Sequence, residues 1–192
     1  KMITLLIVSS RLYGLTNELS DTDYLAIISD GESYPFPENK DIEVRTVSEF
    51  QASLDKHDLK ALEVYFGYPE LFPNTIPATF TFNEDSLRRA VSGVSSNAHV
   101  KSKKKIRDGE IYVGIKSFWH CLRILTMYTD LAKNKTFDPK VYVDQLTETY
   151  VDILKHMDLP PEEIFKTLVL KYDRHMKDLL HEFRLLCPLQ PK

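Results

Sequence analysis

The chain has 192 residues, a length that fits one domain or a small catalytic unit followed by a helical extension. Hydrophobic residues make up 43% of it, which is ample for a core, and the net charge of −3 argues against a protein that coats nucleic acid nonspecifically. Cys121 and Cys187 have no metal-ligand spacing, so we expect free thiols in a cytoplasmic protein. Because no apolar run is long enough for a span, and the N-terminal run leads straight into a polar motif, we expect neither a membrane partner nor a signal peptide.

The N-terminal segment predicts two strands joined by a turn rich in hydroxyl groups. Apolar runs predict strands over residues 2–9 and 22–29, with one or two helical turns over residues 10–18. Asp21 and Asp23 stand at the start of the second strand, and their spacing of two sends both carboxylates to one face. Neighbouring carboxylates repel each other, and Mg²⁺ or Mn²⁺ relieves that repulsion. The pattern predicts a metal site, with a solvated strand start as the alternative.

Residues 41–47, DIEVRTV, predict a third, half-buried strand because charged and apolar residues alternate along it. Asp41, Glu43 and Arg45 share one face of that strand. A helix is then expected over residues 49–66, with a break near His57 and Asp58. Ser48 and Gln51 predict a capping box at its start.

The rest of the chain predicts helices. The proline-containing stretch 67–83 is expected to be irregular and to mark a boundary, which divides the chain into residues 1–84 and 85–192. Helices are expected over residues 85–104, 110–133 and 139–157, and a last helix is expected from Pro160 or Pro161. The fold class is therefore α+β: a small mixed β-sheet with flanking helices, followed by a helical C-terminal region packed on that core.

The helix expected over residues 110–133 carries a basic row beside its apolar stripe. Lys116, His120 and Arg123 recur at spacings of four and three, so they line one face. That face lies beside the apolar stripe, where it could flank a cleft; a solvated basic face is the alternative. The apolar stripe is Ile111, Ile115, Phe118, Leu122 and Leu125.

The stretch VSSRLYGLTNELSDTDY, residues 8–24, resembles the signature of the polymerase-beta-type nucleotidyltransferase superfamily. In the form SSRLYG followed by SDTD it is similar to the RlaP group of predicted nucleotidyltransferases of bacteria and phages. Residues 103–125 resemble the later helix of that group, whereas Ser9 departs from the motif because the family has glycine there. The residues that agree with the motif are Ser10, Arg11, Tyr13, Gly14, Ser20, Asp21 and Asp23.

The resemblance implies an enzyme that moves a nucleoside monophosphate from an NTP, ATP foremost, to a hydroxyl group and releases pyrophosphate. It implies Mg²⁺ or Mn²⁺ as cofactor, with Asp21 and Asp23 as catalytic metal ligands. The family takes a third carboxylate from a strand beside the first two, and both Asp41 and Glu43 are candidates for it. The expected nucleotide-binding residues are Ser9, Ser10, Arg11, Lys116, His120 and Arg123.

Two classes of function stay open at this point. By resemblance the acceptor is an RNA end, in RNA repair, while a protein side chain or a small molecule is the alternative. Ser9 in place of glycine favours a second class, a catalytically weak or inactive protein with the nucleotidyltransferase fold. Such a protein would serve as a nucleotide- or protein-binding module, for example a phage factor that targets a host protein. The sequence indicates no oligomeric state.

Overall fold

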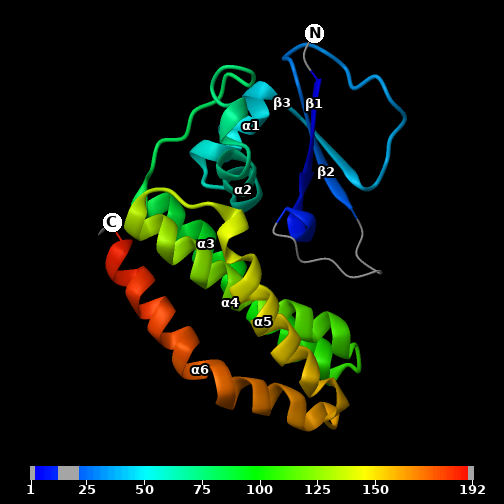
Figure 1. The fold of residues 1–192 in the computed structure, drawn as a ribbon, viewed down its shortest axis with the longest axis vertical. Coiled ribbons are helices and arrows are strands. Elements are labelled where there is room, and N and C mark those ends of the chain that lie inside the picture. Colours follow the sequence, from blue (N-terminus) through cyan, green and yellow to red (C-terminus); the bar gives the residue numbers. More distant parts are fainter. Residues whose placement is uncertain (1–2, 13–21, 190–192) are drawn as a thin grey trace. The chain divides into compact units, whose positions relative to one another are not determined.

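The computed structural model describes residues 3–12 and 22–189, and there the chain forms a small mixed sheet followed by helices (Figure 1). The expected α+β fold class is confirmed. The chain divides into two compact units, the first formed by residues 1–86 and 138–143, the second by residues 87–137 and 144–192. The short segment 138–143 thus joins the first unit although it lies far along the chain.

The sheet has the order β1-β2-β3, with β2 in the centre. Strand β1 (Ile3–Val8) runs antiparallel to β2 (Asp23–Ile28), and β3 (Ile42–Thr46) runs parallel to β2. All three expected strands are confirmed. The parallel pairing requires the chain to return over residues 29–41 to the end of the sheet at which β2 began.

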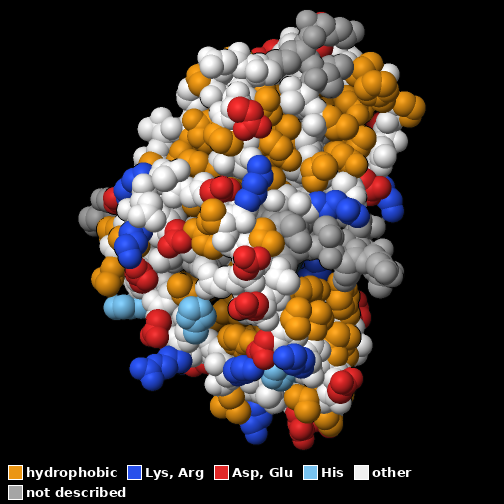
Figure 2. All heavy atoms as spheres, viewed as in Figure 1, with side chains coloured by type: hydrophobic (Ala, Val, Ile, Leu, Met, Phe, Trp, Pro, Cys, Tyr) orange, Lys and Arg blue, Asp and Glu red, His pale blue; other side chains and the backbone are white. Residues whose placement is uncertain are grey.

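One face of the sheet is covered by α1 (Val47–Asp55) and α2 (Leu59–Gly67). Leu25 and Ile27 on β2 are fully buried, as is Phe50 on α1. The other face is more open, since Leu5 and Ile7 on β1 remain 50% and 40% exposed. Figure 2 shows hydrophobic side chains at the surface at the upper right, the part of the view in which Figure 1 places the strands.

Helix α1 begins directly after β3, at a capping box formed by Thr46 and Glu49. The Glu49 N–H donates to Thr46 Oγ1 at 3.2 Å, and the Thr46 N–H donates to Glu49 Oε2 at 2.8 Å. The expected box of Ser48 with Gln51 was wrong. Because the helix starts two residues earlier than that box requires, the Ser48 hydroxyl is free of the cap and donates to Asp30 Oδ2 at 2.8 Å.

The expected break near His57 and Asp58 is confirmed. His57 has a left-handed backbone, with φ of 58°, and the Asp58 carboxylate caps α2 by accepting the Ala61 N–H at 3.0 Å. Burial lowers the pKa of His57, and its Nε2 accepts the Asn83 N–H at 2.9 Å. His57 is therefore a neutral, hydrogen-bonded histidine that stabilises the turn.

The second unit is helical and contains most of α3 (Glu84–Arg107), α4 (Ile111–Asn134), α5 (Val143–Leu154) and α6 (Pro161–Leu186). The helix expected over residues 139–157 is divided, since 3-10 turns at Pro139–Tyr142 and Lys155–Asp158 flank α5. Helix α4 packs chiefly on α6, and Trp119 is buried and donates from Nε1 to the Leu146 carbonyl at 3.1 Å. Within the described residues, no helix combines the length and apolar character needed to cross a membrane.

Helices α3 and α4 approach each other closely at Gly114. A Cβ atom at this position would lie 2.5 Å from Ile106 Cγ1 and 2.9 Å from the Ile106 backbone nitrogen. Those distances are shorter than van der Waals contact. The two helices can approach this closely because glycine has a hydrogen in place of a Cβ.

We expect Gly114→Ala to lower the free energy of unfolding by about 1–3 kcal/mol, the range for overpacked cores, although alanine is the better helix former. Gly93→Ala is the matched control, because nothing lies within 4 Å of a Cβ at Gly93 on α3. That variant should gain up to about 1 kcal/mol from helix propensity. Urea unfolding of both variants tests whether α3 and α4 approach each other this closely. A Gly114→Ala protein as stable as the wild type would contradict it.

Candidate functional site

Three strand ends meet at one end of the sheet. Val8, the last residue of β1, pairs with Asp23, the first residue of β2. Tyr24 pairs with Ile42 of β3, and the Tyr24 N–H donates to the Asp41 carbonyl at 2.8 Å. Extending this parallel register by one residue puts Asp41 opposite Asp23. Both residues were proposed for the site from the sequence, and the structure places them on neighbouring strands at the same end of the sheet.

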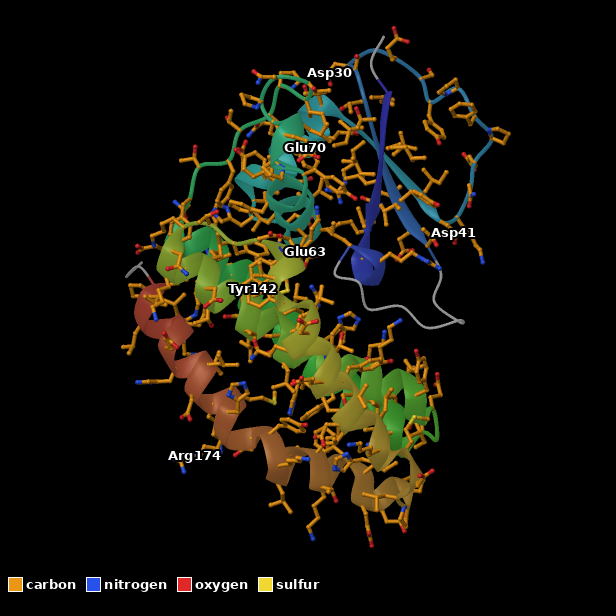
Figure 3. The ribbon with its side chains drawn as sticks, in the orientation of Figure 1. Asp30, Asp41, Glu63, Glu70, Tyr142 and Arg174 are labelled. Carbon is orange, nitrogen blue, oxygen red and sulfur yellow. The ribbon has the colours of Figure 1, made fainter. Side chains whose placement is uncertain are left out.

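Asp23 and Asp41 belong to the same face of the sheet, because paired residues of neighbouring strands share a face. Figure 3 shows Asp41 next to the first residue of β3. Neighbouring strands lie about 4.8 Å apart, so two carboxylates at opposed positions repel each other. A cation bound between them would remove this repulsion.

Glu43 lies on the same face but has a different electrostatic environment. Lys60 of α2 donates from Nζ to Glu43 Oε2 at 2.7 Å, and Arg45 donates from Nε to Oε1 at 2.6 Å. Burial raises the pKa of Glu43, but the hydrogen bonds and charges of Lys60 and Arg45 outweigh it and hold the pKa below the ordinary value. Both oxygens of Glu43 are therefore engaged by cations of the protein itself.

Lys60 is the residue at this site that the sequence analysis missed. It lies 17 residues from Glu43 along the chain, on a helix whose sequence carries no motif. No local signal in the sequence could have paired these two side chains, since their contact depends on how α2 packs on the sheet.

The turn that follows β1 has a backbone conformation that favours glycine. Ser9–Arg11 forms a 3-10 turn in which the Leu12 N–H donates to the Ser9 carbonyl at 2.9 Å. Ser9 has φ of 60°, in the left-handed region that costs a non-glycine residue about 1–2 kcal/mol. The motif that this turn resembles has glycine at this position, and a φ of 60° is a conformation that glycine adopts without that cost.

Asp21, Ser20, Tyr13 and Gly14, together with the side chain of Ser10, lie outside the described residues. Arg11 is described, and its side chain is exposed.

The three basic residues proposed on the later helix lie on α4, in the second unit. Arg123 is only 7% exposed, and its Nη1 donates to Met127 Sδ at 3.6 Å. Burial, followed by the positive charges of Arg123, Lys116 and Lys101, lowers the pKa of His120 to about 3, so this imidazole is neutral near pH 7. A nucleotide-binding role for Lys116, His120 and Arg123 stays a prediction.

The oxygen atoms available at one part of this site suit a divalent metal ion. Asp23 and Asp41 offer carboxylate oxygens, which suit Mg²⁺ and Mn²⁺. Glu43 would have to give up Lys60 or Arg45 before it could act as a ligand. Within residues 3–12 and 22–189, no group of three or more histidine, cysteine or acidic side chains is gathered for a metal, and Asp21 lies outside these ranges.

Comparisons of the chain with protein-family models, with curated proteins and with solved structures find no match. The resemblance to nucleotidyltransferases therefore rests on residues 8–24 and 103–125 of the sequence.

The two candidate third carboxylates should respond in opposite ways when their charge is removed. In buffer with a chelator, Asp41→Asn should raise the free energy of unfolding by up to about 1 kcal/mol, because it removes the repulsion with Asp23. Glu43→Gln should lower it by about 1 kcal/mol, an amount that allows for solvent screening of a side chain that is 37% exposed. Urea unfolding of both variants measures the difference.

Glu38→Gln, in the exposed loop before β3, serves as the control for loss of one negative charge. Because the folded-state pKa of Glu43 is below its ordinary value of 4.5, the Glu43→Gln effect should be complete above that value and fade as the pH falls through the folded-state pKa. Equal loss of stability in Asp41→Asn and Glu43→Gln would contradict the distinction drawn between the two acids.

Proposed function

We propose that the chain is a metal-dependent nucleotidyltransferase that transfers a nucleoside monophosphate from an NTP to a hydroxyl acceptor and releases pyrophosphate. The observation that supports this proposal is the meeting of Asp23, Asp41 and the Ser9–Arg11 turn at one end of the sheet. The motif resemblance implies this grouping: a hydroxyl turn after the first strand, acids on the second, and a further acid on a strand beside it.

In this proposal Asp23 and Asp41, together with Asp21, hold Mg²⁺ or Mn²⁺. When bound, the ion would offset part of the negative charge of the triphosphate and would lower the pKa of the attacking hydroxyl. Asp41 is the candidate to accept the proton of that hydroxyl.

The remaining polar groups have supporting roles. The hydroxyl and N–H groups of Ser9 and Ser10, with the Arg11 guanidinium, donate to phosphate oxygens. Glu43 is a positioning residue, because it holds Lys60 and Arg45 in place beside the acids. The resemblance favours an RNA end as the acceptor and ATP as the donor.

A second candidate function is a binding module that keeps the fold and has little or no turnover, such as a phage factor acting on a host protein. The observation that favours it is Ser9, whose side chain occupies a left-handed position suited to glycine. A glycine there would let the backbone approach phosphate more closely.

We expect wild-type protein to bind Mn²⁺ in calorimetric titrations and to release pyrophosphate from an NTP in the presence of mixed RNA. Asp41→Asn and Asp21→Ala should each weaken Mn²⁺ binding by at least about tenfold, because each removes a direct ligand. Glu43→Gln and the control Glu38→Gln should leave Mn²⁺ affinity close to wild type. Unchanged affinity in Asp41→Asn would remove that residue from the site.

Substitution of Ser9 by glycine separates the two candidate functions. If the chain is an enzyme slowed by the serine, Ser9→Gly should raise the rate of pyrophosphate release. If it is a binding module, Ser9→Gly should bind Mn²⁺ and NTP as the wild type does, with no pyrophosphate released by either protein. The Asp41→Asn, Ser9→Gly double variant is the control for contaminating activity.

A further inference from the structure

The second unit contains a cavity of about 280 Å³ between α3, α4 and α6, formed by residues that the proposed reaction does not use. Its lining includes apolar side chains of α4 and α6, among them Leu125, Met176 and Leu180. Ser92, Ser95, Ser96 and His99 line it from α3, at positions i, i+3, i+4 and i+7 of one helix face. The cavity therefore combines an apolar lining with one polar wall.

The polar wall of the cavity includes a residue on the buried line of α3. The buried residues of this helix are Leu87, Val91, Ser95, Ser102 and Ile106. Serine is too small to fill the space that leucine or valine fills elsewhere on this line, so a hollow forms at its middle. A larger apolar residue at Ser95 would pack better, and the open space is therefore a feature that helix packing alone does not favour.

His99 presents a neutral imidazole to the cavity. Its ring contacts those of Phe165 and Phe118, with centroid separations of 5.4 Å and 6.3 Å, and burial lowers its pKa. In the described part of the chain, the ring nitrogens of His99 have no hydrogen-bond partner. The imidazole thus has a ring N–H donor available to a ligand.

Arg184 brings a positive charge to the same cavity. Arg184 lies in the last turn of α6, and this end of the helix is bonded to α3, because Arg88 of α3 donates from Nη1 to the Cys187 carbonyl at 2.8 Å. Lys177 forms an ion pair with Asp173 at 2.6 Å, so these two charges cancel. Across the described ranges, the Arg184 guanidinium has no ion-pair partner. The lining consequently carries one uncompensated cation and several hydrogen-bond donors.

We propose that this cavity binds a small organic carboxylate with an aromatic or branched aliphatic body. The body would lie against Leu125, Met176 and Leu180, and the carboxylate would accept two parallel hydrogen bonds from Arg184. His99 and Ser96 supply further donors. The volume of 280 Å³ is just below the lower end of the usual range for ligand pockets, about 300–1,000 Å³, which limits the body to roughly one ring.

Ligand-observed ¹⁹F NMR of the full chain with 4-fluorobenzoate tests this proposal. The probe should bind at millimolar concentration, whereas 4-fluorobenzylamine, which has a similar body but a positive charge, should not. Acetate, which lacks the body, should not displace 4-fluorobenzoate at equal concentration. Arg184→Gln should weaken 4-fluorobenzoate binding by roughly tenfold or more, because it removes a hydrogen bond to a charged group. Ser96→Leu, at an exposed position on the cavity wall, should block binding.

Arg174→Gln is the matched control, since Arg174 lies on the same helix (Figure 3) and is not part of the cavity. Its side chain is 95% exposed. It should bind the probe as the wild type does. Absence of binding by the wild type, equal binding by Arg184→Gln, or equal binding of the benzylamine would overturn the proposal. None of these outcomes depends on nucleotidyl transfer, so the two proposals can fail separately.

Discussion

The parallel pairing of β2 with β3 is the constraint on which the candidate site depends. Two parallel neighbours must start at the same end of a sheet, so the chain returns over residues 29–41 before β3 can begin. The hydrogen bond from the Tyr24 N–H to the Asp41 carbonyl fixes the register at that end. A shift by one residue would turn Asp41 to the other face of the sheet and separate it from Asp23.

The two acids of β3 differ because of what α2 brings to them. Lys60 reaches Glu43 and, with Arg45, compensates its charge, whereas Asp41 lies opposite another acid. Glu43 is therefore stabilised within the protein, whereas Asp41 would be stabilised by the cation that we propose for this site. The capping of α2 by Asp58, whose Oδ1 also lies 3.5 Å from Arg45 Nη1, links the start of that helix to the same group of charges.

Much of the secondary structure could be predicted from the sequence because it depends on local patterns. Alternation and apolar runs located the strands, and Asp58 marked the break between α1 and α2. The capping box was misplaced because Thr46 with Glu49 and Ser48 with Gln51 both fit the capping pattern in the sequence, and α1, which begins at Val47, uses the first pair. The pairing of Glu43 with Lys60, the return of residues 138–143 to the first unit and the cavity beside His99 depend on contacts between distant segments. Even so, the spacing of Ser92, Ser95, Ser96 and His99 was a readable signal of a polar helix face.

A crystal structure of the chain with Mn²⁺ and a nonhydrolysable NTP analogue would test whether Asp23 and Asp41 bind the metal together, because anomalous scattering locates the metal independently of activity. We expect an anomalous peak within coordination distance of the Asp23 and Asp41 carboxylates, with Glu43 still held by Lys60 and Arg45. A metal bound by Glu43 with Asp41 turned away, or a nucleotide bound at a different part of the sheet, would contradict it.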